Sequence, residues 1–190
     1  MNKHFIDARQ LLEDSFNLGW QVYQSGFKPT CIVGVWRGGT PVGIAVQELL
    51  RVMGVKSDHV AIRTASYSGI GKRSRHIEVH GLTYITDRVK GDDTLLIVDD
   101  VYDTGLSINQ VIAELNNAYQ NNSPEIRIAT PYYKPGNNKT SREPDYYLHQ
   151  TEDWLVFPHE LEGLTPEEIR NNKPELAAFI DQLESQLQSN

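Results

Sequence analysis

The residues best suited to chemistry are two adjacent aspartates and the small polar turn that follows them. Asp99 and Asp100 close the apolar run 95–98, which predicts a strand buried on both faces, and the turn leads into a helical pattern at 108–115. A loop entering a helix N-terminus offers free N–H groups and a positive dipole end, which suits a phosphate. Carboxylates beside a phosphate repel it unless a cation or sugar hydroxyls lie between them. The segment therefore predicts a sugar phosphate held with a divalent metal, Mg²⁺. The alternative is an ordinary strand–turn–helix capped by Thr or Ser.

A second anion site is predicted in the loop Gly34–Pro41, which lies between a strand and a helix. Gly38 and Gly39 permit close approach of the backbone to a ligand, and Arg37 adds a fixed positive charge. Open α/β sheets bind ligands at the carboxyl ends of their strands. The alternative is a tight turn with a surface arginine. Two anion sites on adjacent strand ends match a substrate that carries phosphates at both ends.

Residues 66–81 are polar, basic and glycine-containing, and they predict a mobile excursion from the fold. A flexible basic segment over a phosphate site can close, exclude water and neutralise developing charge. The alternative is a solvated surface loop. The candidate residues of this segment are Ser66, Tyr67, Lys72, Arg73 and Arg75.

An acceptor site is indicated by a lysine and a tryptophan in the second half of the chain. Lys134 follows a predicted strand, where its ammonium group can donate hydrogen bonds to an oxygen. The indole of Trp154 offers a flat face on which a base can stack. Taken separately, the alternatives are a surface charge for Lys134 and core packing for Trp154.

These residues need a scaffold in which strands and helices alternate. The patterns predict strands at 31–36, 60–65, 95–98, 126–133, 146–148 and 155–157, and helices near 7–25, 41–54 and 107–120. Thr165-Pro-Glu-Glu168 is a capping box with proline at the first helical position, which opens a final helix. This alternation indicates an α/β fold with a mostly parallel central sheet and helices on both faces. No repeat or linker marks a second domain, so residues 1–190 are assigned to one.

Composition narrows the classes of function. The net charge of −7 argues against a broad nucleic-acid surface, which needs clustered Lys and Arg. No apolar run approaches the ~18 residues of a membrane span. The only cysteine, Cys31, lies in an apolar run, where we expect a small buried hydrophobe. Without a signal-peptide pattern or an internal disulfide, the chain is predicted to be cytoplasmic.

The segment 95–107 closely resembles the signature of the type I phosphoribosyltransferases, which bind 5-phosphoribosyl 1-pyrophosphate (PRPP). The resemblance implies that Asp99 and Asp100 hold the ribose hydroxyls and help to position Mg²⁺. The loop implied to cradle the 5′-phosphate consists of Asp103, Thr104, Gly105, Leu106 and Ser107. Leu106 departs mildly from the family, in which a smaller or more polar residue is common.

Further resemblances extend over residues 30–160. The loop of Arg37, Gly38 and Gly39 resembles the family's pyrophosphate-binding loop, and the segment that begins Ser66-Tyr67 resembles its flexible catalytic loop. The dipeptide Ser-Tyr is the one that purine-specific members place there.

The acceptor residues resemble the 6-oxopurine branch, the hypoxanthine, guanine and xanthine phosphoribosyltransferases. In that branch a lysine, here Lys134, contacts the 6-oxo oxygen, and an aromatic residue, here Trp154, stacks on the ring. Leu155 is implied to offer backbone contacts to the base edge. The spacing of Trp154, Pro158 and Glu160 resembles the short microbial xanthine–guanine enzymes. His159 stands where an aromatic residue is common, so the preferred base stays open.

The resemblance implies a purine-salvage reaction in which purine N9 attacks the ribose and pyrophosphate leaves. Asp103 would act as general base, and Mg²⁺ with Arg37 would stabilise the leaving pyrophosphate. A small hood from about 134–190, with 1–26 as a further candidate, would cover the base, and the assembly would be a homodimer or homotetramer. The rival reading is a PRPP-sensing regulator, which usually needs an added DNA-binding domain or a basic face. A pyrimidine-specific transferase is a third reading, and it would not need the lysine–tryptophan pair.

Overall fold

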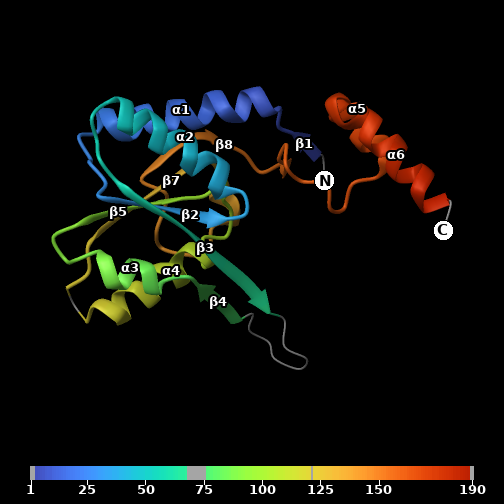
Figure 1. Ribbon diagram of the computed structural model, residues 1–190. Coiled ribbons are helices and arrows are strands. Elements are labelled where there is room, and N and C mark those ends of the chain that lie inside the picture. Colours follow the sequence, from blue (N-terminus) through green and yellow to red (C-terminus); the bar gives the residue numbers. More distant parts are fainter. Residues whose placement is uncertain (1–2, 68–75, 121, 189–190) are drawn as a thin grey trace. The chain divides into compact units, whose positions relative to one another are not determined.

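The computed structural model describes residues 3–67, 76–120 and 122–188, and these form two compact units (Figure 1). The larger unit contains residues 12–152, and the smaller unit contains residues 1–11 and 153–190. Residues 12–26 and 134–152, which the sequence assigned to the proposed hood together with 1–11 and 153–190, belong to the larger unit. Helix α1 and strand β8 hold them there through contacts with the sheet.

The larger unit is built on a mixed sheet. Its strands are β2 (Cys31–Trp36), β3 (Asp58–Tyr67), β4 (His76–His80), β5 (Thr94–Val98), β6 (Val101–Tyr102), β7 (Glu125–Tyr133) and β8 (Tyr146–Gln150). Their order is β4-β3-β2-β5-β7-β6, and β8 also pairs with β7. The pairs that join β2 to β3 and β5, and β7 to β5, β6 and β8, are parallel. The predicted α/β class with a mostly parallel sheet is confirmed.

Helices cover both faces of this sheet (Figure 1). They are α1 (Ala8–Gln24), α2 (Gly39–Val52), α3 (Thr83–Arg88) and α4 (Leu106–Tyr119). Figure 1 shows α1 and α2 on one face and α3 and α4 on the other. The run Leu95–Val98 is fully buried between the two helical layers, as its continuous apolar sequence predicted. Cys31 is buried as predicted, and burial raises the pKa of its thiol to about 12.

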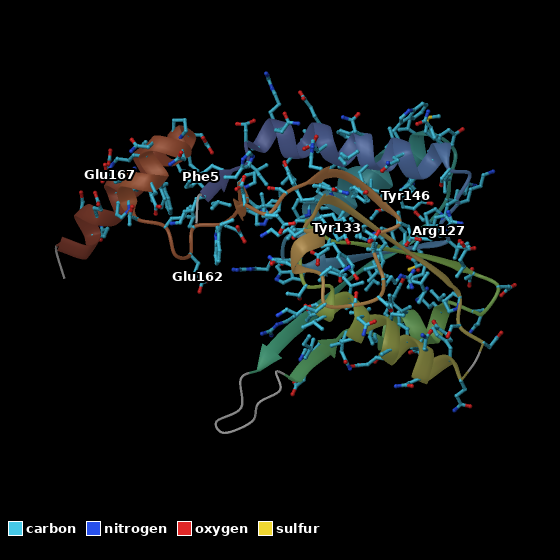
Figure 2. The ribbon with its side chains drawn as sticks, turned by 180° about the vertical axis from the view of Figure 1, so that it is seen from behind. Phe5, Arg127, Tyr133, Tyr146, Glu162 and Glu167 are labelled. Atoms are coloured by element: carbon cyan, nitrogen blue, oxygen red, sulfur yellow. The ribbon has the colours of Figure 1, made fainter. Side chains whose placement is uncertain are left out.

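Polar contacts fasten strand β8 to β7 and to helix α1. Arg127 of β7 donates a hydrogen bond to the Tyr146 hydroxyl of β8 at 2.7 Å, and both side chains are labelled in Figure 2. The carboxylate of Asp14 from α1 lies 3.0 Å from His149 Nε2 of β8. These contacts explain why residues 134–152 belong to the larger unit.

The predicted mobile excursion at 66–81 is wrong at both of its ends. Strand β3 continues to Tyr67, and β4 pairs with it in antiparallel register from Arg63 opposite His80 to Tyr67 opposite His76. Polar and apolar residues alternate along β4, and its Val79 packs against the core. These residues therefore form a half-buried strand despite their largely polar composition. Ser66 and Tyr67 therefore belong to a strand. Lys72, Arg73 and Arg75 lie outside the described residues.

The smaller unit joins the two ends of the chain. Strand β1 (Lys3–Phe5) pairs in parallel with β9 (Trp154–Val156). The predicted capping box is confirmed, since the Thr165 side chain accepts from the Glu168 N–H at the start of α5 (Pro166–Asn172). The expected single final helix is interrupted at Pro174, and α6 (Ala177–Gln188) follows. No helix within the described residues is long and apolar enough to cross a membrane.

Candidate active site

The two predicted anion loops meet at the carboxyl ends of β2 and β5. A Cβ built on Gly38 would lie 1.7 Å from Asp100 Oδ2, and one on Gly39 would lie 2.4 Å from the Val98 carbonyl oxygen. A side chain at either position would therefore collide with the acidic loop. The glycines allow the backbone after β2 to pack directly against the aspartates, which places both loops in one site. Arg37 is exposed at the start of this loop.

The two glycines should respond differently to alanine. At Gly38 the obstacle is the flexible end of Asp100, so Gly38→Ala should displace that carboxylate and lower kcat/KM for PRPP, the substrate that the sequence resemblance implies, by about 10–100-fold, with the fold intact. At Gly39 the obstacle is backbone, so Gly39→Ala should lower the free energy of unfolding by about 1–3 kcal/mol. Thermal unfolding and steady-state kinetics separate the two effects.

Gly43→Ala is the matched control, because a Cβ there meets its nearest atom, Gly34 Cα, at an ordinary 3.7 Å. Unchanged kinetics in Gly38→Ala would contradict the placement of Asp100 in the site.

The acidic pair is held close in a poorly solvated place. Burial raises the pKa of the Asp99 carboxyl well above its usual range, and the charge of Asp100 raises it further. The Asp100 N–H donates to Asp99 Oδ1 at 3.0 Å, and the Gly39 N–H also donates to this carboxyl. Because two neighbouring carboxylates with little solvation repel each other, a cation bound beside them would stabilise their charged forms. Among the described residues, no cluster of three or more His, Cys, Asp or Glu could hold a metal without further ligands.

The predicted phosphate loop forms a small pocket at the start of α4. Gly105 has a φ of +73°, and a Cβ on it would lie 2.6 Å from the Tyr102 hydroxyl, so glycine is required there. The pocket has a volume of about 90 Å³ and is lined by Asp99, Val101, Tyr102, Asp103, Thr104, Gly105, Ser107 and Ile108. Backbone N–H groups at the beginning of α4 supply donors for an anion there. Leu106 is the first residue of that helix, and its side chain is exposed.

A residue that the sequence analysis overlooked braces this loop. The Tyr102 hydroxyl lies 3.0 Å from both Thr140 Oγ1 and the Arg142 carbonyl oxygen. The Lys139 N–H donates to the Thr104 carbonyl at 3.0 Å. The segment after β7 therefore supports the phosphate loop from outside. The only sequence signal was a large aromatic residue inside an otherwise small-residue loop.

The structure also brings together two predicted residues from separate motifs. Tyr133, labelled in Figure 2, ends β7, and Lys134 follows it. The Lys134 ammonium lies 3.4 Å from Asp103 Oδ2, and only 7% of this lysine is exposed. The other carboxylate oxygen, Asp103 Oδ1, is buried and has no hydrogen-bond partner among the described residues. A buried cation and an incompletely satisfied carboxylate thus stand side by side at the phosphate pocket.

The remaining acceptor residues belong to the smaller unit. Trp154 is 57% exposed, which excludes core packing within that unit, and Leu155 is buried. The carboxylate of Glu160 accepts a hydrogen bond from the Phe157 N–H at 3.0 Å. Lys134 lies in the larger unit.

Comparison with known proteins identifies the family. The model of the phosphoribosyl transferase domain matches residues 5–163. The chain belongs to this family. No curated protein matches the sequence of this phosphoribosyltransferase.

Solved structures share its fold. A purine phosphoribosyltransferase from Pyrococcus horikoshii is 31% identical over 87% of this chain and 98% of its own, with a TM-score of 0.67. A xanthine-guanine-hypoxanthine phosphoribosyltransferase from Helicobacter pylori is 23% identical over 85% and 96% of the two chains, with a TM-score of 0.64. A hypothetical protein from Neisseria gonorrhoeae with bound ppGpp is 16% identical over 92% and 97%, with a TM-score of 0.72. At these identities the last two show the fold alone.

Proposed function

We propose that this phosphoribosyltransferase transfers the 5-phosphoribosyl group of PRPP to a 6-oxopurine, which yields a nucleoside 5′-monophosphate and pyrophosphate. The observation that carries the proposal is the pair of Lys134 and Asp103, 3.4 Å apart beside the phosphate pocket. A 6-oxopurine presents O6 and N7 side by side on one edge. An ammonium donor and a carboxylate acceptor at that spacing complement O6 and a proton on N7. The similarity to the purine phosphoribosyltransferase of Pyrococcus horikoshii supports a purine acceptor.

PRPP would lie across the two loops at the ends of β2 and β5. The 5′-phosphate would occupy the pocket formed by Asp103 to Ser107, where Thr104, Gly105, Leu106 and Ser107 begin or precede α4. The pyrophosphate would lie against Arg37, Gly38 and Gly39. Because Gly38 and Gly39 abut the acidic pair, the ribose between the two phosphate groups would meet the carboxylates of Asp99 and Asp100.

The acidic pair also fits Mg²⁺. Hard carboxylate oxygens are the donors that this ion prefers, and Mg²⁺ is commonly held by one or two carboxylates together with substrate phosphates. The mutual repulsion of Asp99 and Asp100 would be relieved by a divalent cation. When bound, the metal neutralises charge on the departing pyrophosphate.

Asp99→Asn and Asp100→Asn should each weaken the use of PRPP and leave the fold intact. Because burial disfavours the charged form of Asp99, the neutral Asp99→Asn variant should be at least as stable as the native protein at neutral pH. Calorimetric titration with PRPP and Mg²⁺ measures the affinity, and thermal unfolding measures the stability. Asp92→Asn, a change at an exposed position, is the control. Native affinity in both site variants would remove the pair from the PRPP site.

The chemistry follows from the placement of Lys134 and Asp103. The base would enter with a proton on N7, and its N9 lone pair would form a bond to the anomeric carbon as the carbon–pyrophosphate bond breaks. The N7 proton would pass to the Asp103 carboxylate, whose Oδ1 has no hydrogen-bond partner among the residues that the structure describes. Arg37 would stabilise the charge that develops on pyrophosphate. Trp154, Leu155 and Glu160 are the further base-binding residues of this proposal.

The proposal is tested by identifying the product. Incubation with PRPP, Mg²⁺ and hypoxanthine, guanine or xanthine should yield the corresponding nucleoside monophosphate, resolved by chromatography and mass. A PRPP-sensing regulator would bind PRPP and form no nucleotide with any base. A pyrimidine transferase would form nucleotide only with a pyrimidine. A cytoplasmic location and a dimeric or tetrameric assembly remain predictions from the sequence.

A further inference from the structure

A buried lysine without a role in the reaction holds the loop that follows β9. Lys173 lies at the end of α5 and is only 3% exposed. Its ammonium donates to the carbonyl oxygens of Phe157 at 2.7 Å and Pro158 at 3.0 Å. Both contacts lie within the smaller unit and span more than a dozen residues of sequence. One side chain therefore fixes two consecutive peptide groups of residues 154–160. We call this segment, which consists of strand β9 and the turn after it, the 154–160 loop.

This lysine is in an unfavourable electrostatic environment. Burial lowers the pKa of the Lys173 ammonium, and the charges of Glu175 and Glu160 oppose that effect only in part. Its hydrogen bonds in the described residues go to carbonyl oxygens and not to a carboxylate. A buried cation that forms no ion pair among the described residues contributes little to the stability of a fold. Its donors nevertheless bond two carbonyl groups of an irregular segment, and the first of them, that of Phe157, also accepts from the Glu160 N–H.

The rest of the 154–160 loop is fixed in complementary ways. The Glu160 N–H donates to the Phe157 carbonyl at 3.0 Å, and the Glu160 carboxylate accepts from the Phe157 N–H at the same distance. At its other end, Leu155 pairs with His4 in β1, and the Ile6 N–H donates to the Val156 carbonyl. The loop is therefore anchored by β1 on one side and by Lys173 on the other. The exposed Trp154 projects from this anchored segment.

We propose that Lys173 is a positioning residue for base recognition, which acts by holding the 154–160 loop in the conformation that presents Trp154 and the Leu155 backbone to the purine. The inference rests on the proposed function, because it assigns this loop to the base. Lys173 does not touch the base. It sets the position of the groups that do.

The test compares Lys173→Met with the native protein. Methionine keeps the length of the side chain and removes all donors. We expect KM for the 6-oxopurine to rise by about 10-fold, which corresponds to about 1.4 kcal/mol. KM for PRPP and kcat should stay within about two-fold, because the PRPP loops lie in the other unit. Amide hydrogen exchange at Phe157 and Glu160 should become faster.

Arg9→Met is the matched control, since Arg9 belongs to the same unit and is exposed on α1, away from β1 and the 154–160 segment in sequence. It should leave the base KM and the exchange at Phe157 and Glu160 unchanged. Lys173→Arg retains charge and donors, and it should recover part of the base affinity even if Lys173→Met is poorly stable.

The outcomes separate this inference from the proposed function. Faster exchange with an unchanged base KM, or equal losses for base and PRPP, would overturn the positioning role. If the native protein converts no base, the proposed function fails. In that case the exchange rates still test the inference. If amide exchange in Lys173→Met matches that of the native protein, the inference is overturned as well. Faster exchange in the variant supports the role of Lys173 in holding the loop.

Discussion

Asp103→Asn is expected to lower kcat by about 10²–10⁴-fold, with the affinity for PRPP little changed. Asparagine is nearly isosteric and can still accept a hydrogen bond from Lys134, but it cannot take the proton from purine N7. The structure removes the main alternative, in which Asp103 only caps the helix. The N-cap of α4 is Gly105, and no side-chain cap hydrogen bond is formed there.

Single-turnover kinetics would isolate the chemical step, and calorimetry would give the PRPP affinity. The control is thermal unfolding of Asp103→Asn, which should show a folded protein with a modest loss of stability, because the buried Lys134 ammonium loses its anionic partner. Near-native turnover in this variant would leave Asp103 a structural residue and move the proton to solvent.

Lys134→Ala is expected to raise KM for the 6-oxopurine far more than KM for PRPP. A site built to donate to an oxygen rejects an analogue that lacks it by as much as about 10⁴-fold, because its buried donor then loses its partner. Lys134 is well placed for this role, since it is almost fully buried and directly follows strand β7 of the central sheet. The variant should also lose most of its preference for hypoxanthine over adenine. Steady-state kinetics with both bases at saturating PRPP measures each effect.

Lys139→Ala provides a matched control. Lys139 lies five residues further along, is exposed, and supports the phosphate loop through its backbone N–H and not its side chain. It should leave base selectivity unchanged. Equal rises of KM for base and PRPP in Lys134→Ala would mean that the lysine only shapes the phosphate loop through Asp103.

Much of the scaffold could be predicted, because periodicity reports on burial. The run 95–98 is apolar throughout and forms the central strand β5, and the capping box at Thr165 starts α5 as expected. The loops after β2 and β5 were also foreseeable as neighbours, since parallel strands end at one edge of a sheet. The close approach of Gly38 to Asp100 agrees with that expectation.

Other features depend on contacts that a linear pattern does not report. Strand β4 has a polar composition, and only its pairing with β3 makes it a strand. The contact between Lys134 and Asp103 joins residues 31 positions apart. Lys173 reads as a surface lysine before Pro174, and its burial depends on the fold of the smaller unit around it. Each of these depends on tertiary packing, which outweighs local preference.

The most direct test of a 6-oxopurine phosphoribosyltransferase is pyrophosphate release from PRPP and Mg²⁺ with hypoxanthine, guanine, xanthine, adenine and a pyrimidine supplied one at a time. We predict release with at least one of the three 6-oxopurines, little release with adenine, and none when base or Mg²⁺ is omitted. Equal release with adenine and hypoxanthine would contradict the role of Lys134. No release of pyrophosphate with any base would contradict the proposed phosphoribosyltransferase activity.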